Sequence, residues 1–353
     1  MTGLLSGGRT GGTIKKGWVT AGLVACLAAV IFLGVGLGAV RVPPREVFTL
    51  LFKGPVPGDP ESQVRWEILW RLRLPRVLMG LLVGFFLGIA GAVMQGLFRN
   101  PMADPYILGV SSGASLGAVL GIVFGVGRAL GAWALPLPAF LGAFCAMVVV
   151  YSLATWHGRT ELLTLLLSGI ALSSMISSGV ALIMVLFRQR TEEIVFWTMG
   201  GLARSSWSSV RVSLPYVLVL GTLIWLLSRP LDVLAFGEET AFHLGLDVER
   251  SKRLALFGAS LITAQSVAFT GPIGFVGLVV PHAVRLIIGP AHRWLVPCSG
   301  LAGASLLVLS DLLARTLVPP AEIPVGVITA MGGAPFFLYL LFQQRKRGRG
   351  TES

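Results

Sequence analysis

Hydrophobic residues fill ten long stretches of this chain, and polar residues gather in the segments between them. A helix needs about 20 apolar residues to cross a bilayer, and the stretches are close to that length. Pro281, His282 and Arg285 interrupt the eighth, which predicts a short or broken helix whose freed backbone faces protein or water. The expected spans are 18–40, 77–98, 106–127, 134–156, 162–187, 212–228, 254–270, 272–289, 295–317 and 323–343.

The second and third stretches carry a small residue at every fourth position, on either side of a polar hinge at 99–105. A four-residue step keeps side chains on one helix face, so each helix presents a nearly bare ridge. Such ridges allow close helix packing in a bilayer. The small residues are Gly80, Gly84, Gly88, Ala92 and Gly96, followed by Gly109, Gly113, Gly117, Gly121 and Gly125.

Composition places the chain in a membrane. Of its 353 residues, 54% are hydrophobic and 12% are charged, and the mean hydropathy is +0.82. Soluble proteins carry about 25% charged residues, so this chain lacks a surface suited to water. The net charge of +12 lies mostly in loops and tails, which favours contact with lipid headgroups over binding of nucleic acid. Lysine and arginine are divided almost evenly between the two expected faces, so charge alone does not set the orientation.

Motifs for catalysis or metal binding are missing from the sequence. It has no Gly-Lys-Ser/Thr phosphate loop, no His-Glu-x-x-His pair and no aspartate-rich cluster. Cys26, Cys145 and Cys298 stand singly, and the four histidines are scattered. We therefore expect neither an enzyme nor a bound metal or cofactor.

Asp311 and Arg315 are unusual because charges are rare inside membrane helices. They stand four residues apart and can pair on one helix face. The pair either closes the helix end or marks an ion site. A weaker signal is the repeat of GASL at 113–116 and 303–306, since transporters are often built from repeated halves.

The hydrophilic segment 229–253 is predicted to form two short helices broken at Gly237 and Gly245. Such helices either rest on lipid headgroups or dock into a soluble partner.

Several motifs in order resemble one family, the FecCD/BtuC-type permeases of bacterial ABC importers for iron chelates and cobalamin. The resemblance covers about residues 65–343. The motifs are RLPR at 73–76, RNPMAD at 99–104, LGVS at 108–111, LSGIAL at 167–172, WTMGG at 197–201, GPIGFVG at 271–277, VPH at 280–282 and EIPVG at 322–326.

The resemblance implies an all-α integral membrane protein with about ten transmembrane helices, the BtuC-like (type II) permease fold. It implies two subunits around a central pathway in the bacterial cytoplasmic membrane, with both termini cytoplasmic. The implied permease domain is 18–343, between a tail at 1–17 and a basic tail at 344–353. Within it, 41–76 is a periplasmic loop and 229–253 a cytoplasmic coupling loop.

The implied partners are a cytoplasmic ABC ATPase dimer, which binds ATP and magnesium, an extracytoplasmic substrate-binding protein and a second permease copy. A homodimer is expected, with a heterodimer open. Cargo would move by alternating access. We expect an iron chelate, either ferric siderophore or haem, with cobalamin as the alternative. An ion-coupled secondary transporter using Asp311 is a rival from another class.

The resemblance also carries over roles to individual residues. At the positions of Leu162 and Leu163, which fall in the implied cytoplasmic gate, relatives have small polar residues. The residues implied to dock the binding protein are Arg73, Arg76, Arg315 and, more loosely, Arg65. Those implied to contact the ATPase are Glu238, Glu239, His243, Leu244 and Gly245. The implied cytoplasmic gate is Asn100, Pro101, Met102, Leu162 and Leu163. The glycines implied in packing or in the pathway are Gly80, Gly84, Gly88, Gly113, Gly117, Gly271, Gly274 and Gly277.

Overall fold

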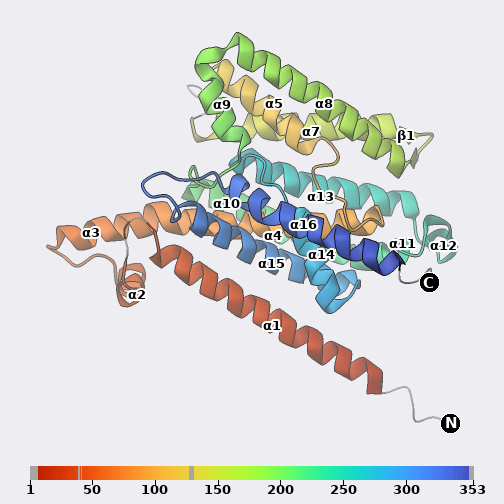
Figure 1. The fold of residues 1–353 in the computed structure, drawn as a ribbon, viewed down its shortest axis with the longest axis horizontal. Helices are drawn as coiled ribbons and strands as arrows, with labels where there is room; N and C mark the ends of the chain where they lie inside the picture. Colours follow the sequence, from red (N-terminus) through yellow and green to blue (C-terminus); the bar gives the residue numbers. More distant parts are fainter. Residues whose placement is uncertain (1–6, 39, 41, 127–130, 350–353) are drawn as a thin grey trace.

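The computed structural model describes residues 7–38, 40, 42–126 and 131–349, and most of them are helical (Figure 1). One short antiparallel hairpin pairs Thr155 with Thr160 and Trp156 with Arg159. The elements are α1 (Gly7–Gly36), α2 (Pro44–Lys53), α3 (Pro60–Glu67), the π-helix η1 (Ile68–Arg73), α4 (Leu74–Leu97), α5 (Val110–Val123), η2 (Gly131–Trp133), α7 (Pro136–Ala154), β1 (Thr155–Trp156), β2 (Arg159–Thr160), α8 (Leu162–Leu186), η3 (Arg188–Arg190), α9 (Thr191–Thr198), α10 (Trp207–Leu226), α11 (Ser228–Leu234), α12 (Glu238–His243), α13 (Val248–Thr270), α14 (Val276–Ile288), α15 (His292–Ala314) and α16 (Val325–Arg349).

Each of the ten expected spans coincides with one helix: α1, α4, α5, α7, α8, α10, α13, α14, α15 or α16. Among the described residues, six helices are long and apolar enough to cross a membrane, and three shorter apolar helices accompany them. The eighth is short, as predicted: α14 has 13 residues with Pro281 inside it. The all-α membrane fold is therefore confirmed.

Several helix ends differ from the expected boundaries. α1 begins at Gly7, inside the expected tail at 1–17, and α16 continues to Arg349, inside the expected tail at 344–353. α13 begins at Val248, within the expected coupling loop. Hydropathy marks only the part of a helix that lies in lipid, whereas backbone hydrogen bonds continue the helix into polar sequence. The expected tail residues 1–6 and 350–353 lie outside the described residues.

The expected loop at 41–76 is also largely helical, formed by α2, α3 and η1, and α4 already begins at Leu74. α2 starts with proline in its first turn, where the missing N–H is not needed. It buries Val47 and Leu50 and exposes Phe48 and Phe52.

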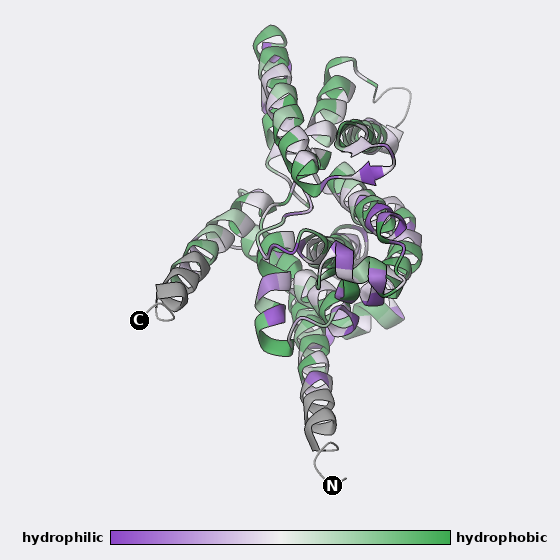
Figure 2. Cartoon of the chain, turned by 90° about the vertical axis from the view of Figure 1, so that its right-hand side faces the viewer, coloured by the Kyte–Doolittle hydropathy of each residue, from purple (hydrophilic) through white to green (hydrophobic). Residues whose placement is uncertain are grey.

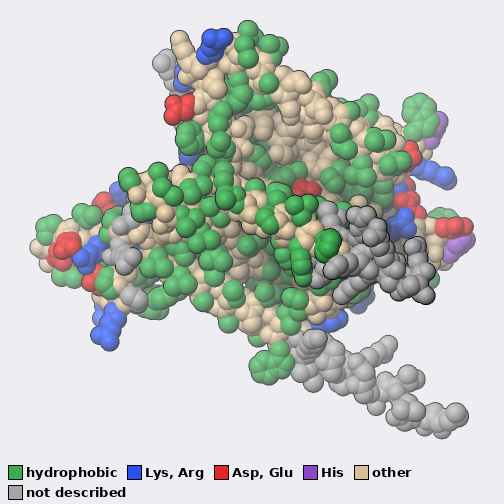
Figure 3. Space-filling model, in the orientation of Figure 1, with side chains coloured by type: hydrophobic (Ala, Val, Ile, Leu, Met, Phe, Trp, Pro, Cys, Tyr) green, Lys and Arg blue, Asp and Glu red, His purple; other side chains and the backbone are tan. Residues whose placement is uncertain are grey.

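The helices form two layers with α1 along the outside. α5, α7, α8 and α9 make one layer, and α4, α10 and α13 to α16 make the other (Figure 1). Hydrophobic residues predominate along the helices (Figure 2), and charged side chains gather mainly at the two ends of the helices (Figure 3). α4 lies at the centre and packs against α10, α13, α14 and α15. α11 and α12 lie at one end of the molecule, where α1 begins and α16 ends (Figure 1).

The glycine ridges lie where helices approach most closely. A Cβ at Gly84 or Gly88 of α4 would overlap the backbone of Gly303 or Ser299 in α15. Gly117 of α5 meets Pro138 of α7 in the same way. The other glycines of the ridges and of the expected pathway have different kinds of neighbour. Gly113 faces the backbone of Gly142, Gly80 has side chains of Leu202 and Val308 nearby, Gly271 faces the carbonyl of Trp197, Gly277 faces the ring of Pro105, and Gly274 has open space beside it. Both copies of the GASL repeat therefore begin at a close helix contact.

Candidate docking face, coupling helices and gate

Five charged side chains form a cluster at the end of the molecule opposite α11 and α12. They come from the end of η1, the start of α4, the end of α15 and the segment before α16. Arg76 Nε lies 2.8 Å from Asp311 Oδ1, and Arg76 Nη1 lies 2.8 Å from Glu322 Oε2. Arg315 Nε lies 3.3 Å from Asp311 Oδ2, so the predicted pair of residues 311 and 315 is confirmed. Arg73 completes the cluster.

Two of these arginines cap the end of α1. Arg73 donates hydrogen bonds to the carbonyl groups of Val35 and Gly36, and Arg315 donates to the carbonyl of Gly34. The last carbonyls of a helix have no partner within it and carry the negative end of its dipole. Arg73 and Arg315 are each only 6% exposed. Their guanidinium groups are therefore largely buried within the subunit, and their docking role stays a prediction.

The other two expected docking residues lie nearer the surface. Arg65, on α3, pairs with Glu46 at 2.6 Å and with Glu61 at 2.5 Å, and 29% of its side chain is exposed. Arg76 is less accessible because Asp311 and Glu322 hold its guanidinium group.

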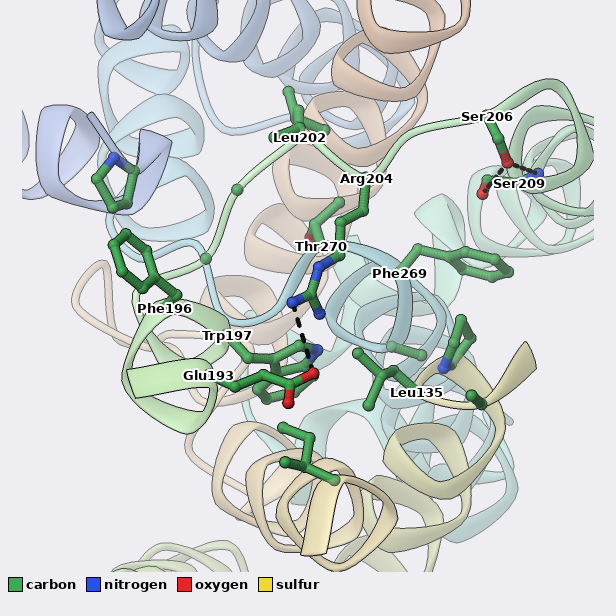
Figure 4. A pocket seen from close by; sticks show the side chains of 18 of the residues that line it. Leu135, Glu193, Phe196, Trp197, Leu202, Arg204, Ser206, Ser209, Phe269 and Thr270 are labelled. Carbon is green, nitrogen blue, oxygen red and sulfur yellow. Dashed lines mark hydrogen bonds and ion pairs between the residues drawn. The ribbon is translucent and has the colours of Figure 1, made fainter. Parts of the chain in front are cut away.

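A cavity of about 860 Å³ opens at this same end, between the two helix layers. Arg204 and Glu193 point toward each other across it, 3.9 Å apart (Figure 4). Phe196, Trp197 and Phe269 supply aromatic walls. Five segments far apart in the sequence line the cavity, so the sequence analysis missed it. Its signals were three of the family motifs, RLPR, WTMGG and EIPVG, which contribute Arg76, Trp197 and Glu322 to the lining.

The segment after α10 has the predicted form. α11 and α12 are two short helices, with Gly237 (φ 112°) and Gly245 (φ 81°) at the breaks. Such φ values favour glycine. Phe242 and Leu244 are 69% and 67% exposed, beside the exposed Glu239, His243 and Gly245. Large apolar side chains exposed on a polar loop are typical of a protein interface. The last expected coupling residue, Glu238, is half-buried and lies 3.0 Å from Lys252.

The expected gate residues come from two places at this end. Asn100 Oδ1 accepts the backbone N–H of Met102 at 2.9 Å, which shapes the hinge around the half-buried Pro101. Leu162 and Leu163 begin α8 directly after the β1–β2 hairpin, and Leu163 is exposed.

The hinge is fixed to the glycine-rich segment at 271–277. Tyr106 donates its hydroxyl to the carbonyl of Ile273 at 3.0 Å and accepts the Ile273 N–H at 3.1 Å. Burial raises the pKa of Asp104 to about 6, although its carboxylate accepts the Tyr106 N–H. A motion of the hinge would therefore reach 271–277 directly.

A hydrogen-bonded contact between two distant residues at this end was also missed by the sequence analysis. Asp232 Oδ1 accepts the backbone N–H of His292 at 2.9 Å and lies 2.7 Å from His292 Nδ1. Partial burial raises the pKa of Asp232, but the hydrogen bonds from His292 outweigh this and hold it below its usual value. The pair fixes α11 to the start of α15, and 60 residues separate its members.

Comparison with known proteins agrees with this geometry. The model of the FecCD transport family matches residues 26–343. The cobalamin import system permease protein BtuC of Halobacterium salinarum is 46% identical over 317 residues, which cover 86% of this chain and 81% of that protein. The hemin transport system permease protein HmuU of Yersinia pestis is 42% identical over 293 residues, covering 82% of this chain and 87% of that protein.

A solved structure, described as an inward-facing conformation of a metal-chelate type ABC transporter, is 33% identical. It aligns with a TM-score of 0.79 over 91% of this chain and 98% of its own. The family match and these relatives establish a BtuC-like fold and a non-catalytic membrane component. The chain belongs to the FecCD transport family and is a multi-pass permease subunit of an ABC importer.

Proposed function

We propose that this permease imports an iron chelate, a ferric siderophore or haem, by alternating access driven by a separate ATPase. The observation that carries the proposal is the family match along residues 26–343, together with a relative named for hemin transport. Cobalamin is the second candidate cargo, because the relative with 46% identity is named for cobalamin import.

In this proposal the end bearing α11 and α12 faces the cytoplasm. The exposed Phe242 and Leu244 then enter a cleft of the ATPase, with Glu239 and His243 beside them. Both termini would be cytoplasmic, because α1 begins and α16 ends at that same end (Figure 1). The basic residues Lys15, Lys16, Lys346 and Arg347 near these ends agree with the positive-inside rule.

The opposite end would then face outward and dock the loaded binding protein. Arg65 and Arg76 are the proposed contacts, since they lie nearer the surface than Arg73 and Arg315. The cavity of about 860 Å³ opens beside Arg76 and contributes to the outer vestibule. Acidic groups on the partner would exchange for Glu46, Glu61 or Glu322 as the arginines' counter-ions.

A second copy of the permease would complete the pathway. α8 is the candidate lining helix, because only 17% of its most apolar stretch is buried within the subunit. Its exposed positions include Leu167, Ile170 and Leu182, with Ser174 and Ser178 among them. A mixed apolar and hydroxyl surface suits both a subunit contact and a wet passage. We propose a homodimer, with a heterodimer of two related permeases as the alternative.

Transport by a reconstituted complex tests the proposal. Proteoliposomes holding the permease and its ATPase, with the binding protein outside, should take up labelled ferric hydroxamate or haemin only with ATP inside. Labelled cobalamin, offered in parallel, decides between the two cargoes. Uptake driven by a proton or sodium gradient without the ATPase would refute the importer mechanism.

A further inference from the structure

Lys252 carries a buried charge that belongs to none of the expected site residues. Its side chain is only 2% exposed. An ammonium group has three N–H donors, and here two of them donate hydrogen bonds while a second carboxylate forms an ion pair. Nζ lies 3.0 Å from Glu238 Oε2, 2.7 Å from Glu249 Oε1 and 2.7 Å from the carbonyl oxygen of Thr160. Three oxygen atoms therefore surround the ammonium group.

The three acceptors belong to three different elements. Glu238 is the first residue of α12, Glu249 lies on α13 together with Lys252, and Thr160 ends the β1–β2 hairpin. Thr160 is held twice, because its backbone N–H also donates to Glu249 Oε2 at 3.0 Å. Two residues further on, Leu162 begins α8. The Lys252 side chain thus joins α12 to the start of α8, where the expected gate residues Leu162 and Leu163 lie.

Stability alone does not explain such a group. Burying an ammonium and its carboxylate partners carries a desolvation penalty that well-packed apolar residues avoid, so a buried ion pair is weak evidence for a stabilising role. What an apolar side chain does not provide is a directional link between three separate backbone segments. Lys252 provides that link at the point where α12 meets the hairpin.

α12 lies between two glycine turns, next to the firmly attached α11. α11 is fixed to α15 through Asp232 and His292, whose Oδ1 and Nδ1 atoms lie 2.7 Å apart. α12 sits between Gly237 and Gly245, both at positive φ, and its outward face has Phe242 exposed. A force applied to that face would therefore rotate α12 about the two glycines. Glu238 would pass the movement on to Lys252.

We propose that Lys252 is a positioning residue of the transport cycle, which links the coupling helix α12 to Leu162 and Leu163 at the start of α8. The inference rests on the proposed function, because it requires an ATPase that acts on α12. Displacement of Glu238 by the ATPase shifts Lys252 and Thr160 together. The start of α8 then follows the nucleotide state of the partner chain.

The test measures the gate directly and needs no cargo. Full-length permease with Cys26, Cys145 and Cys298 replaced by alanine carries Leu163→Cys as a reporter, in nanodiscs with its ATPase. The rate at which a water-soluble maleimide modifies the reporter is compared without nucleotide and with ATP plus vanadate. In this reference protein we expect the two rates to differ at least about fivefold, within the usual range of coupling between sites.

Lys252→Met should keep ATPase binding but reduce the difference between the two rates to below about twofold. Lys252→Arg, which keeps the charge and the donors, should retain most of the response. The matched control is Arg253→Met, which removes the same charge from the next, exposed position and should respond like the reference. If Lys252→Met does not fold, the neutral variant that adds Glu238→Gln and Glu249→Gln is judged by the same criterion.

A full response in the Lys252→Met protein, or in its neutral counterpart, would overturn this inference and leave the proposed function intact. An unresponsive Lys252→Arg protein would also contradict it. Failure of the reference permease to bind any ATPase would overturn both the proposed function and this inference.

Discussion

The hinge residue Asp104 yields a prediction whose size follows from the structure. It lies between α4 and α5, outside the helices that cross the membrane. Burial raises the pKa of its carboxyl group from the ordinary 3.8 to about 6, although the carboxylate accepts the Tyr106 N–H at 2.8 Å. A change of one in pKa is worth about 1.4 kcal/mol, so the charged form destabilises the folded protein by about 3 kcal/mol.

The sign of the pH dependence follows. Below pH 3.8 the carboxyl group is protonated in both the folded and the unfolded chain, and no penalty arises. As the pH rises to about 6, the unfolded chain loses its proton first and the folded state loses stability. Above that pH the penalty is complete. An asparagine side chain at this position would carry no charge at any pH, and its amide oxygen could still accept the Tyr106 N–H. Asp104→Asn should therefore stabilise the protein at neutral pH.

Thermal unfolding of purified permease in detergent, at pH 7.5 and pH 4, is the assay. At pH 7.5 the variant should unfold about 5 °C higher than the parent, and the gain should largely vanish at pH 4. Asp59→Asn is the matched control, because Asp59 accepts the N–H of Glu61 two residues on but lies at an exposed position. The reasoning is refuted if Asp104→Asn lowers the Tm at pH 7.5, or raises it equally at both pH values.

Three further predictions concern packing, capping and coupling. Gly88→Val should destabilise the permease by about 1–3 kcal/mol or more, because the valine side chain would meet the backbone of α15. Gly22 has open space beside it, so the control Gly22→Val should leave thermal unfolding unchanged. Arg73→Met leaves the buried carbonyl of Val35 without its donor, at about 1–3 kcal/mol, and should speed hydrogen–deuterium exchange at the end of α1; unchanged exchange would contradict the cap. Phe242→Asp and Leu244→Asp alter exposed side chains of the proposed ATPase interface. Each should weaken ATPase binding at least about tenfold without lowering the Tm. Binding at full strength would show that the ATPase docks elsewhere.

The features that the sequence predicted well are those set by local pattern. Gly84 and Gly88 are four residues apart and therefore lie on one face of the helix, whatever packs against it. The glycine ridge could thus be predicted without knowing its partner helix. Gly237 and Gly245 mark backbone turns that other residues adopt with strain, so the two short helices were predictable as well.

The features that were missed depend on contacts between distant segments. The docking role of Arg73 and Arg315 stays a prediction, but the sequence analysis did not predict that they cap α1, whose carbonyls lie 38 and 281 residues away in sequence. The contact of Lys252 was missed for the same reason, since its partner Thr160 lies 92 residues earlier in the sequence. Periodicity says which face a side chain occupies, but it does not identify the carbonyl that it meets.

The cap on α1 also bears on how the protein is made. Synthesis begins at the N-terminus, so α1 enters the bilayer while α15, its main packing partner, is still more than 250 residues from emerging. Until then α1 has only its smaller contacts, among them those with α2, η1 and α4, and its apolar surface suits lipid. Only when Arg315 arrives can its guanidinium group reach the carbonyl of Gly34. The packing of α1 against the rest of the described subunit is thus completed only late in synthesis.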